Sequence, residues 1–429
     1  MIGKYLPRST FARNVITLMT GTTLAQAIPV IISPVLTRMY SPEEFGVFAF
    51  YLALVSVLAV LATGRYELAI LVPREEREAA AVTVLALGVC SVASVLLFIV
   101  VGLFGPEVAA LFNMQGHYQV LYWVPLSVFL MAAYQGLNYW CNRHSYYRQM
   151  SMARMSQSLG MSAAQVGAGS TGAGAFGLVG GALIGHFSAF FFLLVHVLRR
   201  DRERFRGLDV ATLVSTARRF VDFPKFLIAA HSLNMASFQA PIIFLGAIFG
   251  SVVSGFFMLT QRVIGAPMSI VAGAIGDVFR QEASRCYLEN GECKAVYVKT
   301  FKRLLILAVL AFPVFFVIAP DVFAMVFGQD WRVSGDYARI LTPMFFMQFI
   351  TSPLSSMFVL AQKQRMDLVW QFFLFVSVTS SFLLAYAFND LKVGLYCYSA
   401  SYSLMYLING LLSYRLACGH YFKVGHAHG

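Results

Sequence analysis

Apolar residues gather in long runs along the whole chain, and short polar stretches separate one run from the next. Each run holds about 20 residues, which is the length that an α-helix needs to cross the hydrocarbon core of a bilayer. The pattern therefore predicts an all-α membrane protein with about twelve transmembrane helices. The expected helices run roughly over residues 14–36, 46–72, 79–104, 118–140, 151–168, 174–198, 222–246, 251–276, 300–319, 336–361, 366–388 and 392–416.

The composition agrees with this fold class. Of the 429 residues, 59% are hydrophobic and 12% are charged, whereas charged residues make up about 25% of a soluble globular domain. The six cysteines mostly lie in apolar runs, and their spacing matches no common zinc motif. Lys4, Arg8 and Arg13 precede the first run, which has no small-residue cleavage site. We therefore expect a retained membrane helix there and not a signal peptide.

The 32 Lys and Arg residues are distributed unevenly between the two sets of helix ends. With twelve spans, 26 of them fall on the side that carries the N-terminus, four fall on the opposite side, and two lie within helices. Loops rich in Lys and Arg stay in the cytoplasm, so we expect both termini to be cytoplasmic. The same distribution accounts for the net charge of +12 without a nucleic-acid partner.

The two halves of the chain share sequence features that predict an internal duplication. Leu36 to Gly46 with Phe48 recurs as Leu245 to Gly255 with Phe257, at identical spacing. The most basic loop, 199–225, separates six helices from six. We expect an N-terminal lobe over 1–206 and a C-terminal lobe over 207–429, pseudo-symmetric around a central cavity. Transporters that are built from such repeats bind substrate between the repeats.

Two arginines lie inside the expected helices. Arg262, next to Gln261, is the deepest charge, and a charged group at the bilayer centre costs roughly 2.5–3.5 kcal/mol on insertion scales. Such a residue faces a substrate cavity or forms a structural pair with a polar group of another helix. Arg65 lies near a helix end, two residues before Glu67.

Glu67 is the clearest acidic residue inside an expected helix. On a continuous helix, residues two apart point about 200° away from each other, so we expect no mutual pair between Arg65 and Glu67. Glu67 instead pairs with Arg13, at the start of the first helix, or serves in ion coupling.

Several amides also lie at membrane depth. Gln26, Asn234 and Gln239 join Gln261 as candidate substrate-binding residues that could meet sugar hydroxyls, the alternative being hydrogen bonds between helices. No phosphate-binding loop and no H-E-x-x-H motif occurs in the sequence. We therefore expect no catalytic residues, no metal site, no cofactor and no enzyme activity.

One segment resembles a known family. The run Thr37 to Gly46, followed by Arg65 to Ile70 and Pro73, is similar to the first hairpin of the polysaccharide-transport (Wzx-type O-antigen flippase) family. That family belongs to the superfamily of multidrug, oligosaccharidyl-lipid and polysaccharide exporters. The sharp similarity covers roughly the first 75 residues.

The resemblance implies a flippase in the bacterial cytoplasmic (inner) membrane. Its substrate would be an undecaprenyl-diphosphate-linked oligosaccharide repeat unit for O-antigen of lipopolysaccharide, capsule or exopolysaccharide. The implied partners are this lipid-linked oligosaccharide, membrane lipids and the polysaccharide polymerase machinery. Arg262 and Arg65 would meet the diphosphate, and rocking of the lobes would alternate access.

Three alternatives stay open. A cation-coupled multidrug antiporter of the same superfamily would need buried carboxylates, and here Asp277 and Asp367 near helix ends are the only candidates besides Glu67. A lipid II flippase is a close relative of the first interpretation. An envelope-assembly enzyme or scaffold is the third.

Overall fold

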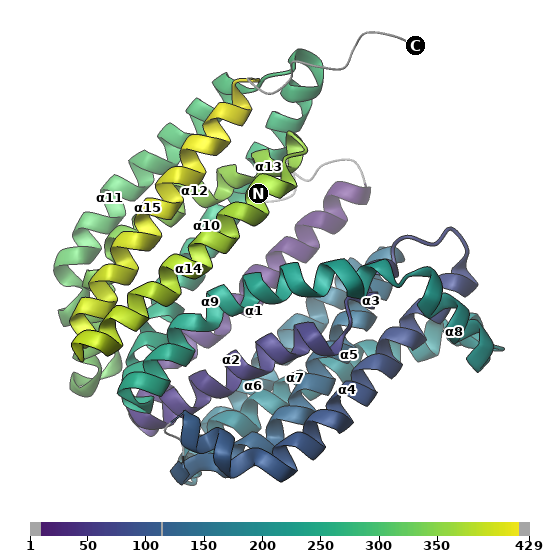
Figure 1. Cartoon of the computed structure of the whole chain (residues 1–429), viewed down its shortest axis with the longest axis horizontal. Helices are drawn as coiled ribbons and strands as arrows, with labels where there is room; N and C mark the ends of the chain where they lie inside the picture. The colour runs from purple at the N-terminus through teal and green to yellow at the C-terminus, as the bar shows by residue number, and fades with distance from the viewer. Residues whose placement is uncertain (1–9, 113–114, 420–429) are drawn as a thin grey trace, which may run out of the picture. The chain divides into compact units, whose positions relative to one another are not determined.

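The computed structural model describes residues 10–112 and 115–419, and within these ranges it contains helices and no strand. Each of the twelve expected helices corresponds to one long helix (Figure 1). These are α1 (Thr10–Met39), α2 (Pro42–Ala62), α4 (Glu76–Leu111), α5 (Val124–Arg143), α6 (Tyr147–Ser170), α7 (Gly174–Arg200), α9 (Ile228–Phe249), α10 (Ser251–Asn290), α11 (Lys294–Phe327), α12 (Arg332–Thr351), α14 (Gln364–Phe388) and α15 (Leu391–Ala417). The predicted all-α class is therefore confirmed.

Three shorter α-helices lie between the long ones. They are α3 (Tyr66–Ala69), α8 (Val210–Arg219) and α13 (Met357–Leu360). By length and composition, ten helices of the described chain could cross a membrane. The long helices outside these ten are α6 and α15. The chain is a multi-pass membrane protein.

The chain forms two compact units, Met1–Gly255 and Phe256–Gly429. In the first unit, α6 packs against α1 and α7, and α2 packs against α9, α5 and α7. In the second unit, α15 packs against α12 and α14, and α11 packs against α12. The packing boundary falls inside α10, whereas the expected lobes divide at 206/207, so that division stays a prediction.

The start of α2 shows how local sequence sets a helix end. Ser41 accepts a hydrogen bond from the Glu44 amide, and the Glu44 carboxylate accepts one from the Ser41 amide at 2.7 Å. Pro42 occupies the first helical turn, where its missing N–H costs no hydrogen bond. This reciprocal pair fixes the polar turn that separates α1 from α2.

The two glycines of the predicted repeat meet at one helix crossing inside the first unit. A Cβ atom on Gly46 would lie 1.7 Å from the Ser251 carbonyl oxygen, and one on Gly255 would lie 1.9 Å from the Pro42 carbonyl oxygen. Pro42 and Gly46 occupy the same places in the repeat as Ser251 and Gly255. The contact is therefore reciprocal, as expected of duplicated segments that cross about a local two-fold axis.

Candidate functional site

The segment after α2 breaks the long helix that we expected over 46–72. The helix ends at Ala62 with Thr63 as its cap, and Gly64 and Arg65 both have φ near +58°. Two successive residues in the left-handed region reverse the direction of the backbone before α3 begins. The expectation of a continuous helix through Arg65 and Glu67 was therefore wrong.

This break brings Arg65 and Glu67 together. The Arg65 Nη1 atom lies 2.9 Å from Glu67 Oε1, and the Glu67 side chain is fully buried. The expectation that these residues do not pair was wrong, because the 200° separation holds only on an uninterrupted helix. The other proposed partner, Arg13, has a side chain that lies outside the described residues.

The Arg65–Glu67 pair retains unused hydrogen-bonding capacity. Arg65 Nε and Glu67 Oε2 are buried, and neither makes a hydrogen bond within the described chain. Buried polar atoms of ionised groups are costly to leave unsatisfied. A further partner at this place would have a donor for the carboxylate and an acceptor for the guanidinium.

Arg262 lies on α10 in the second unit, and its side chain is partly exposed. None of the ion pairs or hydrogen bonds among the described residues of this unit involves its guanidinium. Arg262 therefore differs from Arg65, whose charge is compensated within its own unit. Its five N–H donors are free for an anionic ligand.

A polar cavity of about 600 Å³ lies inside the second unit, lined by α10, α14 and the 3₁₀ turn Ser352–Ser356 that follows α12. Asp277, Arg280, Gln348 and Asp367 line it together with four serines. Asp367 accepts a 2.8 Å hydrogen bond from Gln371 Nε2. Arg280 pairs with Asp277 at 3.6 Å, so the cavity mainly offers hydroxyl, amide and carboxylate groups, which can bind polyhydroxylated molecules.

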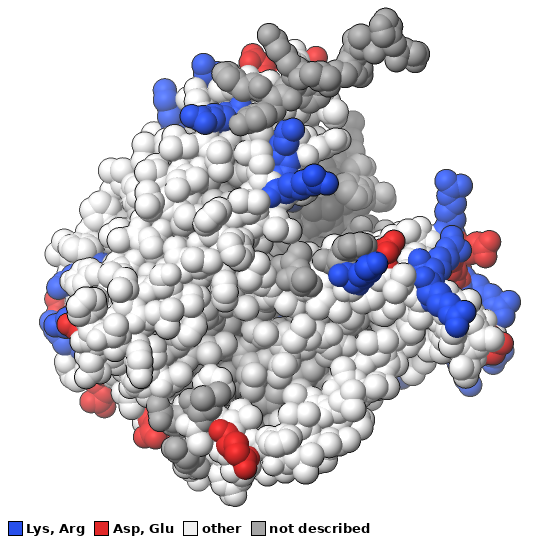
Figure 2. Space-filling view, in the orientation of Figure 1, with Lys and Arg blue, Asp and Glu red and all other residues white. Residues whose placement is uncertain are grey.

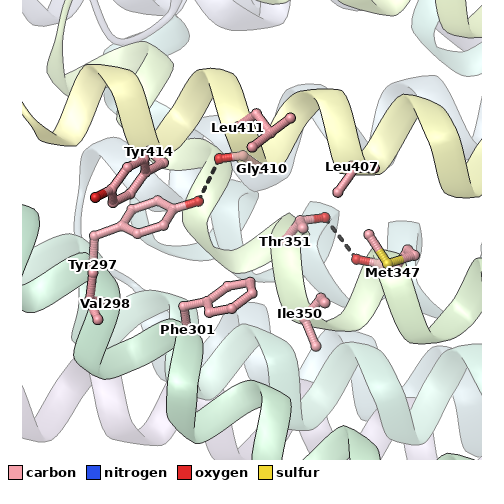
Figure 3. A pocket seen from close by; sticks show the side chains of 10 residues that line it. All are labelled: Tyr297, Val298, Phe301, Met347, Ile350, Thr351, Leu407, Gly410, Leu411 and Tyr414. Atoms are coloured by element: carbon pink, nitrogen blue, oxygen red, sulfur yellow. Dashed lines mark hydrogen bonds between the residues drawn. The ribbon is translucent and has the colours of Figure 1, made fainter. Parts of the chain in front are cut away.

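A second pocket of the same unit, with a volume of about 390 Å³, differs from the polar cavity in its lining. It lies between α11, α12 and α15, and its lining is mostly apolar (Figure 3). The Tyr297 hydroxyl donates to the Gly410 carbonyl at 2.8 Å, and the Thr351 hydroxyl donates to the Met347 carbonyl at 2.8 Å. Because its lining is mostly apolar, this pocket suits an alkyl chain better than a sugar.

The candidate residues do not all lie in one unit. Gln26 on α1 and Asn234 on α9 are exposed, and Gln239 on α9 is half-buried. These three share the first unit with Arg65, whereas Gln261 and Arg262 belong to the second. A binding site that joins all six residues stays a prediction. In the described part of the chain, no cluster of three or more His, Cys, Asp or Glu residues could hold a metal ion.

Comparison with known proteins shows the family. The family model described as "Polysaccharide biosynthesis protein" matches residues 35–336, well over half of the chain. The chain belongs to this polysaccharide biosynthesis protein family. The resemblance seen in the first hairpin is thus confirmed at the level of the family. A search of curated proteins finds no match.

Solved structures show the fold of this polysaccharide biosynthesis protein. An inward-facing multidrug transporter of the MATE family, in the MOP superfamily, is 16% identical, with 95% of this chain and 96% of that chain covered and a TM-score of 0.66. The lipid II flippase MurJ, in an inward closed conformation, is 9% identical, with 93% and 87% covered and a TM-score of 0.75. A MOP transporter from Pyrococcus furiosus is 15% identical, with 94% of each chain covered and a TM-score of 0.59. The chain therefore has the helical MOP-superfamily fold.

Sequence reasoning missed one cation of this family member. Arg154 lies inside α6, where its Nη1 atom donates to Thr22 Oγ1 of α1 at 2.7 Å. It lies within the helix expected over 151–168, but it was not among the candidate site residues. No ion pair of the described chain involves Arg154. Within the described part of the first unit, no carboxylate therefore neutralises Arg154.

Sequence reasoning also missed the polar cavity. Gln348, Gln371, Asp277 and Asp367 stand out one by one as polar residues in or near apolar runs. The sequence does not show that they converge, because the cavity depends on where α12 gives way to the turn at Pro353. Gly276 on α10 assists this arrangement, since a Cβ atom there would lie 3.3 Å from Pro353.

Proposed function

We propose that the chain is a flippase for undecaprenyl-diphosphate-linked oligosaccharide repeat units, working in the assembly of surface polysaccharide such as O-antigen, capsule or exopolysaccharide. The observation that carries the proposal is the match to the polysaccharide biosynthesis family over residues 35–336. The MOP-superfamily fold supports transport in place of catalysis, since the neighbours named above are transporters or flippases.

The chemistry of the candidate residues suits such a substrate. A diphosphate needs cations, and Arg262 and Arg154 have no carboxylate partner in the described chain. Sugar hydroxyls need donors and acceptors, which the polar cavity of the second unit offers. The long prenyl chain would remain in the lipid. On this proposal the diphosphate is bound by Arg262 and by Arg65, whose Nε makes no hydrogen bond within the described chain. Gln261, Gln26, Asn234 and Gln239 bind sugars.

The proposal includes a location. The protein would lie in the bacterial inner membrane with both termini in the cytoplasm, so that the substrate enters from the leaflet where it is made. The polysaccharide polymerase machinery would receive the product. No covalent chemistry is assigned to the chain.

Two transport alternatives have a specific observation in their favour. A lipid II flippase is favoured by the TM-score of 0.75 with MurJ. A cation-coupled antiporter is favoured by the MATE likeness and by the half-buried carboxylate of Asp367. Vesicles that hold the purified chain distinguish these functions, because each takes a different labelled substrate: the lipid-linked oligosaccharide, lipid II or a cationic drug.

The central test is a change of charge at Arg262. Losing one charge-assisted contact to a diphosphate costs about 1.5–3 kcal/mol, or roughly tenfold or more in binding. Arg262→Glu adds repulsion and should stop export of surface polysaccharide in a strain that lacks the native gene. Arg262→Lys keeps the charge and should retain partial export. Surface glycan is measured, with membrane abundance checked by blot.

Arg332→Glu is the control for this test. Arg332 forms an exposed ion pair with Asp321 at 2.8 Å, and such surface pairs contribute little to stability. Export should therefore continue. Normal export by Arg262→Glu at normal abundance would show that this cation is not part of the substrate path.

A further inference from the structure

The short helix α8 presents an apolar stripe that the protein leaves uncovered. One of its faces is buried: Thr216 and, just after the helix, Phe220 are almost inaccessible, and α8 packs against α4. On the opposite face, Val210 is 75% exposed and Val214 is 46% exposed. Val210, Val214 and Arg218 follow one another at four-residue steps and so form one stripe along the helix.

The position of α8 along the chain places it at the edge of the membrane. The chain continues from α8 through Phe223–Leu227 into α9, whose residues His231–Phe249 could span the bilayer. Helix α4, which packs against α8, is also long and apolar enough to span the bilayer, and this candidate span begins at Glu76. The Tyr66 hydroxyl also donates to the Ala217 carbonyl at 3.4 Å. Helices that lie at this depth with one exposed apolar face rest in the headgroup region.

The surroundings of α8 are basic. The segment 199–225 holds eight Lys and Arg residues and four acidic ones. In Figure 2, blue side chains gather over the region of α8. Some of these charges are neutralised, since Arg206 pairs with Glu203 at 2.7 Å and Arg219 pairs with Glu78.

Some exposed cations of the segment 199–225 form no ion pair within the described chain. Arg202 and Arg218 are exposed, and none of the ion pairs among the described residues involves either of them. A valine stripe alone would bind any lipid. Unpaired cations on α8 and in the segment just before it favour a negative surface, and one Lys or Arg near such a surface contributes roughly a fivefold gain in binding.

We propose that α8 binds anionic phospholipids: Val210 and Val214 enter the acyl boundary, and Arg202 and Arg218 contact the phosphate headgroups. This contact anchors the segment between the six N-terminal and six C-terminal helices to the membrane surface. The inference does not depend on which substrate the protein carries.

The test places a reporter on the apolar stripe of the full-length chain. The variant Val214→Trp is reconstituted into vesicles of phosphatidylcholine and phosphatidylglycerol, with brominated acyl chains on one lipid or the other. Fluorescence of the parent chain, which has four tryptophans, is subtracted. Both brominated lipids should quench the added tryptophan. At equal proportion, brominated phosphatidylglycerol should quench about twice as strongly at low salt, and high salt should remove the excess.

Charge variants identify the source of this preference. Arg202→Gln with Arg218→Gln should abolish the excess quenching by phosphatidylglycerol. Arg206→Gln is the matched control and should retain it, because the Arg206 charge is already paired with Glu203. A second reporter, Val210→Trp, repeats the measurement at a more exposed position.

Two outcomes would overturn the proposal. Equal quenching by the two brominated lipids at low salt would mean that α8 enters the membrane without recognising anionic headgroups. No quenching by either lipid, at both reporter positions, would mean that α8 faces water and is open to a protein partner instead.

Discussion

The Arg65–Glu67 pair exists because Gly64 and Arg65 both adopt left-handed backbone angles. Removing one member of a buried pair leaves an uncompensated charge, which costs about 3 kcal/mol or more. We expect Glu67→Gln to lower the melting temperature of the detergent-solubilised chain clearly. The double variant Arg65→Gln, Glu67→Gln should recover most of the loss, since no buried charge remains unpaired.

An exposed pair provides the comparison. Glu203→Gln breaks the pair with Arg206, whose two side chains are more than half exposed, and should hardly change the melting temperature. If Glu67→Gln keeps the melting temperature but abolishes transport, the role of Glu67 is functional and the structural explanation fails.

Arg339 donates hydrogen bonds to α11 at the place where Pro320 removes a helical donor. Pro320 lacks an N–H, so the carbonyl of Phe316, four residues earlier, has no helical donor. The Arg339 Nε atom donates to that carbonyl at 3.1 Å, and Nη2 donates to the Val317 carbonyl at 3.2 Å. From the sequence, Arg339 is only one of the four Lys and Arg residues expected on the side opposite the N-terminus. Its role could not be predicted, because it depends on the Phe316 carbonyl, which lies on another helix and lacks a donor because of Pro320.

A double-mutant cycle tests this role. Arg339→Met should destabilise the protein by about 1–3 kcal/mol, because it leaves the Phe316 carbonyl without a hydrogen-bond donor. In a Pro320→Ala background the restored N–H serves Phe316, so the same change should cost much less. Thermal unfolding in detergent gives both values, and equal costs in the two backgrounds would disprove the link between Arg339 and Pro320.

At the scale of the element, hydrophobic runs predicted the twelve long helices well and their ends poorly. α10 continues to Asn290 and α11 begins at Lys294, whereas we expected 251–276 and 300–319. Both helices extend into charged sequence, because a helix needs no apolar residues once it leaves the bilayer. α8 was not among the expected helices, because its ten residues are too few and too polar to be recognised as a membrane span.

The glycine crossing gives a prediction at this scale. Gly46→Ala or Gly255→Ala places a methyl group against a backbone carbonyl, and such overpacking typically costs about 1–3 kcal/mol. Gly88→Ala and Gly102→Ala in α4 are controls, since a Cβ atom at either position meets nothing within 4 Å. These controls should be neutral or slightly stabilising, because alanine favours the helix over glycine. If all four variants melt alike, the crossing is not tightly packed.

At the scale of the whole molecule, the repeat could be recognised from the sequence but the packing units could not. The spacing from Leu36 to Phe48 and from Leu245 to Phe257 predicts a duplication, and the reciprocal contact of Gly46 and Gly255 fits that prediction. Yet α9 packs against α2, which puts it in the first compact unit. Sequence similarity follows ancestry, whereas a packing unit follows contacts, so the two boundaries need not coincide.

The predicted orientation of the chain in the membrane can be tested at α7, which runs from Gly174 to Arg200 and is long enough to cross the bilayer. Its two ends differ sharply in charge: residues 167–177 carry no Lys or Arg, whereas 199–225 carry eight. Gly172 and Gly207 lie in turns next to these ends, with φ near +70°, and both turns suit an inserted reporter.

A reporter that is active only in the cytoplasm should give signal after Gly207 and none after Gly172. Alkaline phosphatase, active only outside the cytoplasm, should show the opposite pattern at the same two sites. Signal from one reporter at both sites would mean that α7 does not cross the membrane, and a reversed pattern would place both termini outside.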